Sequence, residues 1–161
     1  MDVHKTIHVR APVEEVFRVW NDYAEFPRFM THVREVTLDG GRSRWVVDGP
    51  LGLRATWNAE VTAFEANRLL AWRSLPGSRV ENRGVIRFEP QPDGTTRLDI
   101  RLSYNPPGGA LGHGVARLLG ADPKHSMDDD LLRFKSLVEE GKATARGHTV
   151  TREELRIPPP A

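Results

Sequence analysis

The sequence predicts a single α+β domain in which a curved antiparallel sheet of about seven strands wraps around a long C-terminal helix. Three patterns carry this prediction. Residues 32–104 alternate almost throughout between apolar and polar side chains, two short helical segments lie before that region, and an apolar stripe at helical spacing follows it. The chain of 161 residues has a length that fits one domain.

The N-terminal region predicts one strand and then two short helices. Residues 3–10 alternate in the way that a short strand does. Pro12 stands at a favourable helix start, and Glu14 and Glu15 fall in the first turn, where the helix dipole favours negative charge. We expect the second helix over about residues 24–30. The apolar side chains of the two helices are Val13, Val16, Phe17, Trp20, Phe26, Phe29 and Met30.

The central region predicts the remaining strands, which turn residues separate from one another. Asp39-Gly40-Gly41 is a strong hairpin signal, and Pro92-Asp93-Gly94 marks a later turn. Most of the segments between the turns have one apolar face and one polar face. That pattern is typical of an antiparallel meander with one solvated side. The predicted strands cover residues 33–38, 43–48, 54–64, 69–74, 80–89 and 96–104.

The region after the sheet predicts the long helix. Residues 111–120 already keep helical spacing, and Asp122 and Pro123 suit the N-cap and first position of a renewed helix. Gly141 suits its end. Between these limits runs an apolar stripe of Met127, Leu131, Phe134 and Val138.

The end of the chain is polar and predicts a flexible tail. Residues 142–161 hold few apolar side chains, with Leu155 and Ile157 as one patch that is able to dock. We therefore expect a folded domain over residues 1–141 and a tail over residues 142–161.

Composition narrows the class of protein. The formal net charge is +1, which does not ask for nucleic acid or an anionic membrane as a partner. The absence of cysteine excludes disulfides, thiolate metal sites and cysteine nucleophiles. No run approaches the roughly 18 apolar residues of a membrane span, and no secretory signal is visible. These features predict a cytoplasmic protein without an integral membrane segment.

Catalytic and metal-binding patterns are not apparent in the sequence, and we expect no cofactor. The six histidines are scattered. His4 and His8 are four residues apart, but on a strand that spacing separates them by about 13 Å, so a two-histidine metal site is not expected there. No phosphate-binding loop or nucleophile elbow is present, and we assign no catalytic residue.

The inner face of the predicted sheet suggests a ligand site. A strongly curved sheet closed by one helix leaves a cavity between the two, and apolar walls with few polar groups are typical of a binding pocket. The same side chains also suit an ordinary core, and both interpretations stay open for each residue. The candidate ligand-binding residues are Trp45, Trp57, Trp72, Asn82, Ile86, Leu102, Tyr104, Leu118, Met127 and Leu131.

Several segments of the chain resemble one known family. Residues 7–17 (IHVRAPVEEVF) and 20–30 (WNDYAEFPRFM), together with the Trp45 strand, are similar to the start of the polyketide cyclase/dehydrase family. Residues 82–88 and 129–135 resemble a later strand and the terminal helix of the same family. This family belongs to the START-like, Bet v 1-like (SRPBCC) superfamily, whose members have the helix-grip fold. The resemblance covers roughly residues 3 to 141.

The resemblance implies a function in broad terms. Its superfamily includes lipid carriers, coenzyme Q-binding proteins and polyketide aromatase/cyclases, which share a hydrophobic cavity. We expect this chain to bind a small hydrophobic ligand: a lipid, an isoprenoid quinone or a polyketide-like molecule. One alternative is a cyclase/dehydrase-type enzyme that uses Asn82, Tyr104 or His113. Another is a protein-interaction domain that uses the basic face or the tail.

Overall fold

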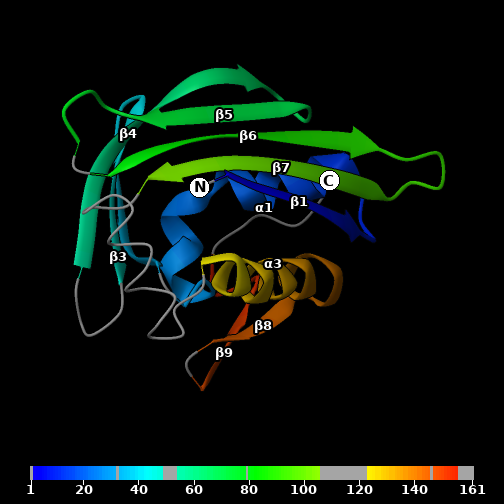
Figure 1. Ribbon diagram of the computed structural model, residues 1–161. Helices are drawn as coiled ribbons and strands as arrows, with labels where there is room; N and C mark the ends of the chain where they lie inside the picture. Colours follow the sequence, from blue (N-terminus) through cyan, green and yellow to red (C-terminus); the bar gives the residue numbers. More distant parts are fainter. Residues whose placement is uncertain are drawn as a thin grey trace.

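The computed structural model describes residues 2–31, 33–48, 54–78, 80–105, 123–145 and 147–155. Its main feature is a strongly curved antiparallel sheet with the strand order β1-β7-β6-β5-β4-β3-β2, and Figure 1 shows α3 running along the inner side of that sheet. The strands are β1 (Asp2–Val9), β2 (Val33–Asp39), β3 (Arg42–Asp48), β4 (Arg54–Glu65), β5 (Leu69–Ser74), β6 (Glu81–Pro90) and β7 (Thr96–Asn105).

The register of the strands separates the two faces of the sheet. Directly opposed residues point to the same side, so one buried residue identifies the face of its partners. Ile86 is fully buried and lies opposite Leu70 and Ile100, which are also buried. These residues belong to the inner face. The alternate positions of the same strands, such as Arg87 and Arg97, are exposed and form the outer face.

Two short helices connect β1 to β2, as the sequence predicts. They are the α-helix α1 (Val13–Asn21) and the 3-10 helix η1 (Tyr23–Arg28). Pro12 precedes the first turn of α1, and Glu14 and Glu15 lie in that turn. The helix buries its apolar side against the sheet, where the rings of Phe17 and Phe88 meet edge to face at 5.0 Å.

The long helix α3 (Pro123–Glu140) closes the inner side of the sheet. It runs parallel to β1, because Lys5 pairs with Asp128 at 2.7 Å and Arg10 pairs with Glu139 at 2.9 Å. Phe134 is fully buried and contacts the ring of Trp20 on α1 at 4.9 Å. The core therefore lies between α1, α3 and the middle of the sheet, where burial of each large apolar side chain stabilises the fold by about 1.5–3 kcal/mol.

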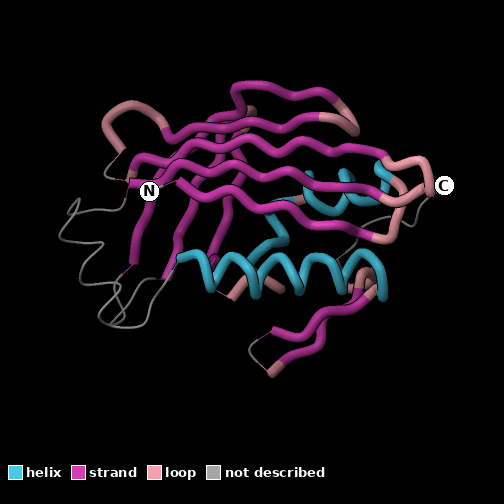
Figure 2. Tube along the Cα trace, turned by 45° about the vertical axis from the view of Figure 1, so that its right-hand side comes forward, coloured by secondary structure: helices cyan, strands magenta, loops and turns pink. Residues whose placement is uncertain are grey.

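The end of the chain differs from the sequence prediction. Residues 142–155 do not form a flexible tail, because β8 (Lys142–Ala145) and β9 (His148–Thr151) pair as a hairpin that ends in a turn. Figure 2 shows this hairpin on the side of α3 that faces away from the sheet. Its apolar side chains Val150 and Leu155 join the main core, so the docking expected for Leu155 is present. Residues 156–161, with Ile157, lie outside the described ranges.

Arg152 fixes this hairpin to the two helices. Its guanidinium forms an ion pair with Glu15 of α1 and donates hydrogen bonds to the carbonyl oxygens of Leu137 and Val138. Those carbonyls belong to the last turn of α3, where acceptors have no partner within the helix, and the Leu137 carbonyl also accepts from the backbone N–H of Gly141 at 3.1 Å. Gly141 ends the helix with a φ of 77°, a left-handed conformation that glycine adopts without strain.

The main architecture agrees with the sequence prediction. The seven strands, the two helices between β1 and β2, and the long C-terminal helix all lie within one or two residues of their predicted limits. Within the described ranges, no helix is long and apolar enough to cross a membrane.

Candidate functional site

The inner face of the sheet is sealed at one end and open at the other. On β6 and β7 the buried residues Ile86, Leu98 and Ile100 form the sealed part. Further along the same strands and on the same face, Asn82 and Leu102 are only half-buried. Because Ile100 lies opposite Lys5, which pairs with the first turns of α3, the half-buried part lies toward the N-terminal end of that helix. We call this part of the inner face the open wall.

Three aromatic rings stack at one side of the open wall. Trp45 on β3 and Trp57 on β4 are direct cross-strand partners, and their rings are nearly parallel with centroids 6.2 Å apart. Tyr23 from η1 also stacks on Trp45, with ring centroids 6.0 Å apart. The indole nitrogen of Trp45 donates a 2.8 Å hydrogen bond to the hydroxyl of Ser43, which fixes the ring orientation. The stack gives the wall a rigid aromatic surface.

Trp72 and Asn82 form the polar part of the open wall. The indole nitrogen of Trp72 donates a hydrogen bond of 3.1 Å to the Asn82 side-chain oxygen. The backbone N–H of Asn82 donates to the Ser74 hydroxyl, also at 3.1 Å. The Asn82 side-chain oxygen is therefore occupied as the acceptor for Trp72. Its Nδ2 group, which carries two donor hydrogens, has no hydrogen bond to any other part of the chain that the structure describes.

Tyr23 adds a second hydrogen-bonding group. Burial raises the pKa of its hydroxyl above the ordinary value of 10.0, so the group stays protonated at neutral pH and is able to donate. Burial, with a contribution from the Glu25 charge, also raises the pKa of the neighbouring Asp22. The sequence analysis did not select Tyr23, although it lies in the segment 20–30 that carries part of the family resemblance.

The candidate residues from the sequence divide into three groups. Trp45, Trp72, Asn82 and Leu102 are half-buried on the open wall, whereas Trp57 lies at its border and is buried, with an exposed fraction of 8%, in a small cluster with Ala59 and Val80. Ile86 and Leu131 lie in the sealed core, with exposed fractions of 0% and 5%, and Met127 is half-buried on α3 and packs against that core. The side chain of Tyr104, and the whole of His113 and Leu118, lie outside the described parts.

The described residues do not assemble a metal centre. Among them, no group of three or more His, Asp or Glu side chains has the arrangement of a metal site. What the open wall offers instead is apolar and aromatic surface with hydrogen-bond donors from Asn82 and Tyr23. Such a surface is suited to an apolar molecule that carries an acceptor oxygen.

Comparison with known proteins relates the chain to one family. A family model described as polyketide cyclase / dehydrase and lipid transport matches residues 1–139. An uncharacterized 17.2 kDa protein from the melC2-rnhH intergenic region of Streptomyces lincolnensis is 27% identical over 138 residues, which cover 86% of this chain and 89% of that protein.

Solved structures extend the comparison to the fold. A crystal structure from Deinococcus radiodurans is 39% identical, covers 88% of this chain and 98% of that one, and has a TM-score of 0.70. The Zhui aromatase/cyclase from Streptomyces sp. R1128 is 19% identical over 87% of this chain and 94% of that one, with a TM-score of 0.69. A START superfamily protein from Mycobacterium smegmatis is 15% identical over 86% of this chain and 97% of that one, with a TM-score of 0.65. At these lower identities the likeness shows the fold alone.

Proposed function

Because the chain belongs to the polyketide cyclase / dehydrase and lipid transport family, we propose that its open wall binds a small hydrophobic ligand. The ligand class is a lipid, an isoprenoid quinone or a polyketide-like molecule. The binding residues in this proposal are Tyr23, Trp45, Trp57, Trp72, Asn82 and Leu102, with Met127 at the edge formed by α3.

One observation carries the proposal: the exposure of the inner face changes along single strands. A sheet face whose only role is to form a core is expected to be sealed along its length, as it is at Ile86 and Ile100. At Asn82 and Leu102 the same face stays half-exposed, and so does Trp72. Aromatic side chains that stay partly accessible on an inward face are typical of a ligand-binding surface.

The polar groups of the wall refine the ligand class. The Nδ2 donors of Asn82 have no acceptor among the described residues, and because the side chain is only half-buried they stay accessible to an acceptor oxygen of a ligand. A ligand carbonyl would supply that acceptor while its hydrocarbon part covers Trp72 and Leu102. Quinones, fatty acyl groups and polyketides all have this combination of apolar body and carbonyl oxygen.

Mass spectrometry tests the proposal. The purified full chain would be weighed under native conditions, then extracted with organic solvent, and the extract identified. We expect a retained adduct that is apolar and contains a carbonyl group. If the chain retains nothing, the same instrument is used after incubation with decylubiquinone, and the absence of a one-to-one complex would contradict the proposal.

Two probes and two variants distinguish the contribution of the apolar part of the wall to binding from that of its polar part. Decylbenzene has the alkyl chain of decylubiquinone without its carbonyl groups, so we expect it to bind about tenfold more weakly. Asn82→Asp keeps an acceptor for Trp72 but removes the donors, and it is expected to reduce the preference for the quinone. Asn58→Asp, on the exposed outer side of β4, is the control and should preserve that preference.

A further inference from the structure

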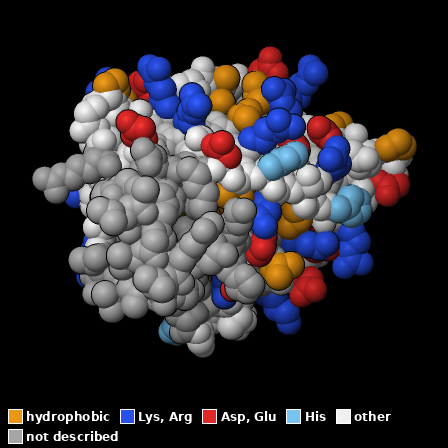
Figure 3. All heavy atoms as spheres, in the orientation of Figure 1, with side chains coloured by type: hydrophobic (Ala, Val, Ile, Leu, Met, Phe, Trp, Pro, Cys, Tyr) orange, Lys and Arg blue, Asp and Glu red, His pale blue; other side chains and the backbone are white. Residues whose placement is uncertain are grey.

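A groove of about 550 Å³ lies on the outer face of the sheet, opposite the face that α3 covers. It crosses β1, β7, β6 and β5 at their ends nearest to Asp2, and Thr62 of β4 is at its border. The side chains that reach it from the outer face include Arg73, Arg83 and Arg101. Figure 3 shows Lys, Arg and His side chains, with acidic side chains among them, on this face of the molecule.

The strand register places these arginines next to one another. Arg73 on β5 and Arg83 on β6 are direct cross-strand partners. Arg101 on β7 lies opposite Val85, which makes it the diagonal neighbour of Arg83. Like charges at directly opposed positions of a sheet destabilise the pairing. The fold therefore retains a local repulsion that an anion in the groove would relieve.

The hydrogen bonds of the arginines leave donors for such an anion. Arg73 donates from Nε to Glu60 at 2.8 Å, and Arg101 donates from Nε to Asp99 at 3.3 Å. For both side chains the terminal Nη groups have no hydrogen bond within the described ranges. The guanidinium group of Arg83 has no hydrogen bond to any described residue. The three side chains thus present unused donor pairs, which suit the two-point recognition of phosphate oxygens.

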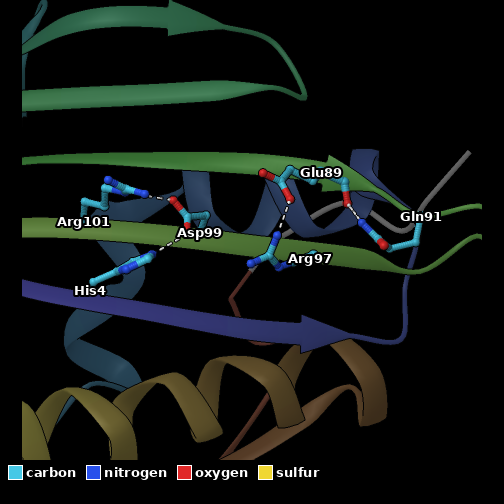
Figure 4. A network of polar contacts seen from close by, with 6 residues as sticks. All are labelled: His4, Glu89, Gln91, Arg97, Asp99 and Arg101. Atoms are coloured by element: carbon cyan, nitrogen blue, oxygen red, sulfur yellow. Dashed lines mark hydrogen bonds and ion pairs between the residues drawn. The ribbon is translucent and has the colours of Figure 1, made fainter.

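A second ion-pair network fixes one side of the groove. Asp99 accepts from His4 at 2.5 Å as well as from Arg101, and Figure 4 shows both side chains converging on it from β1 and β7. The carboxylate of Asp99 is buried by these neighbours. Arg101 is therefore held at its Nε while its terminal nitrogens remain at the groove.

Short side chains form the floor of the groove and leave space beside the arginines. Ser103 lies opposite Arg83, and Val85 lies opposite Arg101, so short side chains stand between long ones. A phosphate group alone is much smaller than 550 Å³. The remaining space lies over Val85 and Ser103, which offer an apolar contact and one hydroxyl.

We propose that this outer groove binds the phosphate group of a small phosphorylated organic molecule, with Arg73, Arg83 and Arg101 holding the phosphate. A phosphate dianion has more charge and more acceptor oxygens than a carboxylate, so it matches three guanidinium groups better. Asp2, the acidic side chain that lines the groove, lies opposite Ser103 on the edge strand and limits the anion to the arginine side. The three arginines point away from the face that carries the open wall, although Trp72 and Leu102 of that wall also border the groove.

Calorimetric titration of the full chain with phenyl phosphate tests the proposal, with phenol as the uncharged counterpart. We expect phenyl phosphate to bind and phenol to give no measurable heat. Arg83→Gln and Arg73→Gln should each weaken binding about tenfold. Arg87→Gln is the matched control, because Arg87 is an exposed arginine on the same strand and face but outside the groove, and it should change the affinity less than twofold.

Three results would overturn the proposal. The first is equal binding of phenyl phosphate and phenol. The second is an equal effect of Arg83→Gln and Arg87→Gln, which would indicate general charge attraction instead of a site. The third is binding to vesicles of phosphatidylcholine with phosphatidic acid, dependent on Arg83, without binding of phenyl phosphate; that result would assign the groove to a lipid headgroup. Thermal unfolding of each variant identifies any that fails to fold. If Arg83→Gln fails, Arg83→Lys replaces it, and we expect a loss of affinity for phenyl phosphate because lysine cannot form the two-point hydrogen bonds of a guanidinium group.

Discussion

The indole ring of Trp72 lies against the backbone of Gly84, its direct cross-strand partner on β6. A Cβ atom at position 84 would stand 2.7 Å from Cη2 and 2.9 Å from Cε2 of the ring, closer than such atoms approach in proteins. Glycine at this position therefore lets the indole lie flat on the sheet, where its nitrogen reaches Asn82. The pair positions the polar part of the open wall.

Gly84→Ala should displace the Trp72 ring and break its hydrogen bond to Asn82. Overpacking of this kind costs about 1–3 kcal/mol, so we expect a loss of that size in urea unfolding together with a change in tryptophan fluorescence. Gly41→Ala is the control, because a Cβ there would meet nothing within 4 Å. Equal stability of the two variants would contradict the close approach of Trp72 to Gly84.

Phe134 and Leu132 test the position of α3. Phe134 is fully buried against Trp20, whereas Leu132 is 62% exposed on the same helix. Phe134→Ala should lower the free energy of unfolding by about 3–5 kcal/mol, and Leu132→Ala should change it by less than about 0.5 kcal/mol. Urea unfolding measures both values. Similar small losses would mean that α3 does not cover the sheet.

Asp99 predicts a contribution to stability that depends on pH. The hydrogen bond from His4, followed by that from Arg101, lowers the pKa of its carboxyl in spite of burial. A carboxyl whose pKa is lower in the folded state stabilises the protein above its unfolded pKa of about 3.9, and this stabilisation is lost as the pH falls toward the folded pKa.

The measurement is urea unfolding at several pH values between 7 and 2.5. The chain should lose stability below about pH 4, and Asp99→Asn should lose less over the same interval. Asp39→Asn, at an exposed position at the end of β2, should follow the unmodified chain. A parallel decline of all three proteins would show that Asp99 makes no such contribution.

Arg152 predicts that the C-terminal hairpin is part of the folded unit. Its replacement by leucine leaves Glu15 without its partner and removes hydrogen bonds to the carbonyls of Leu137 and Val138. Breaking a largely buried ion pair costs about 3–5 kcal/mol. Lys142→Leu, at an exposed position in the same hairpin, should stay within about 0.5 kcal/mol. Unfolding of both variants at the same urea concentration would mean that the hairpin is dispensable.

The strands and the long helix could be predicted because each has a repeated local pattern. Alternation over six or more residues fixes which side chains face inward, and glycine turns such as that at Gly40, with a φ of 60°, fix where strands end. The hairpin of residues 142–151 has strands of four residues each, which is too short for alternation to stand out. Its stability comes from long-range contacts of Val150 and Leu155 with the core, which no local pattern reports.

The candidate site could be predicted in part for the same reason. The alternation of side chains along the strands predicts that Trp45, Trp72 and Asn82 lie on the inner face. It gives no information on the ring of Tyr23, which reaches Trp45 from a separate helix. A bulge between Val61 and Ala63 also shifts the parity of β4. As a result Phe64 faces inward and meets Phe17 at 5.6 Å, which simple alternation does not predict.

The outer groove depends on the register between neighbouring strands, which the alternation within one strand does not determine. The arginines of the outer face are expected from alternation as a solvated charged surface. Whether Arg73 lies opposite Arg83 or one pair further along is decided by the lengths of the turns and by the packing of the inner face. Only the assembled sheet shows that the three arginines share one hollow.

The most direct test of the open wall follows the indole N–H signals of the four tryptophans by ¹⁵N-correlated NMR during addition of decylubiquinone. Trp45 and Trp72 lie on the open wall, whereas Trp20 is buried in the sealed core against Phe134 and serves as an internal control. We expect the Trp45 and Trp72 signals to shift in a saturable manner while the Trp20 signal stays in place. Signals that all remain unchanged, or that all shift equally, would contradict ligand binding at the open wall.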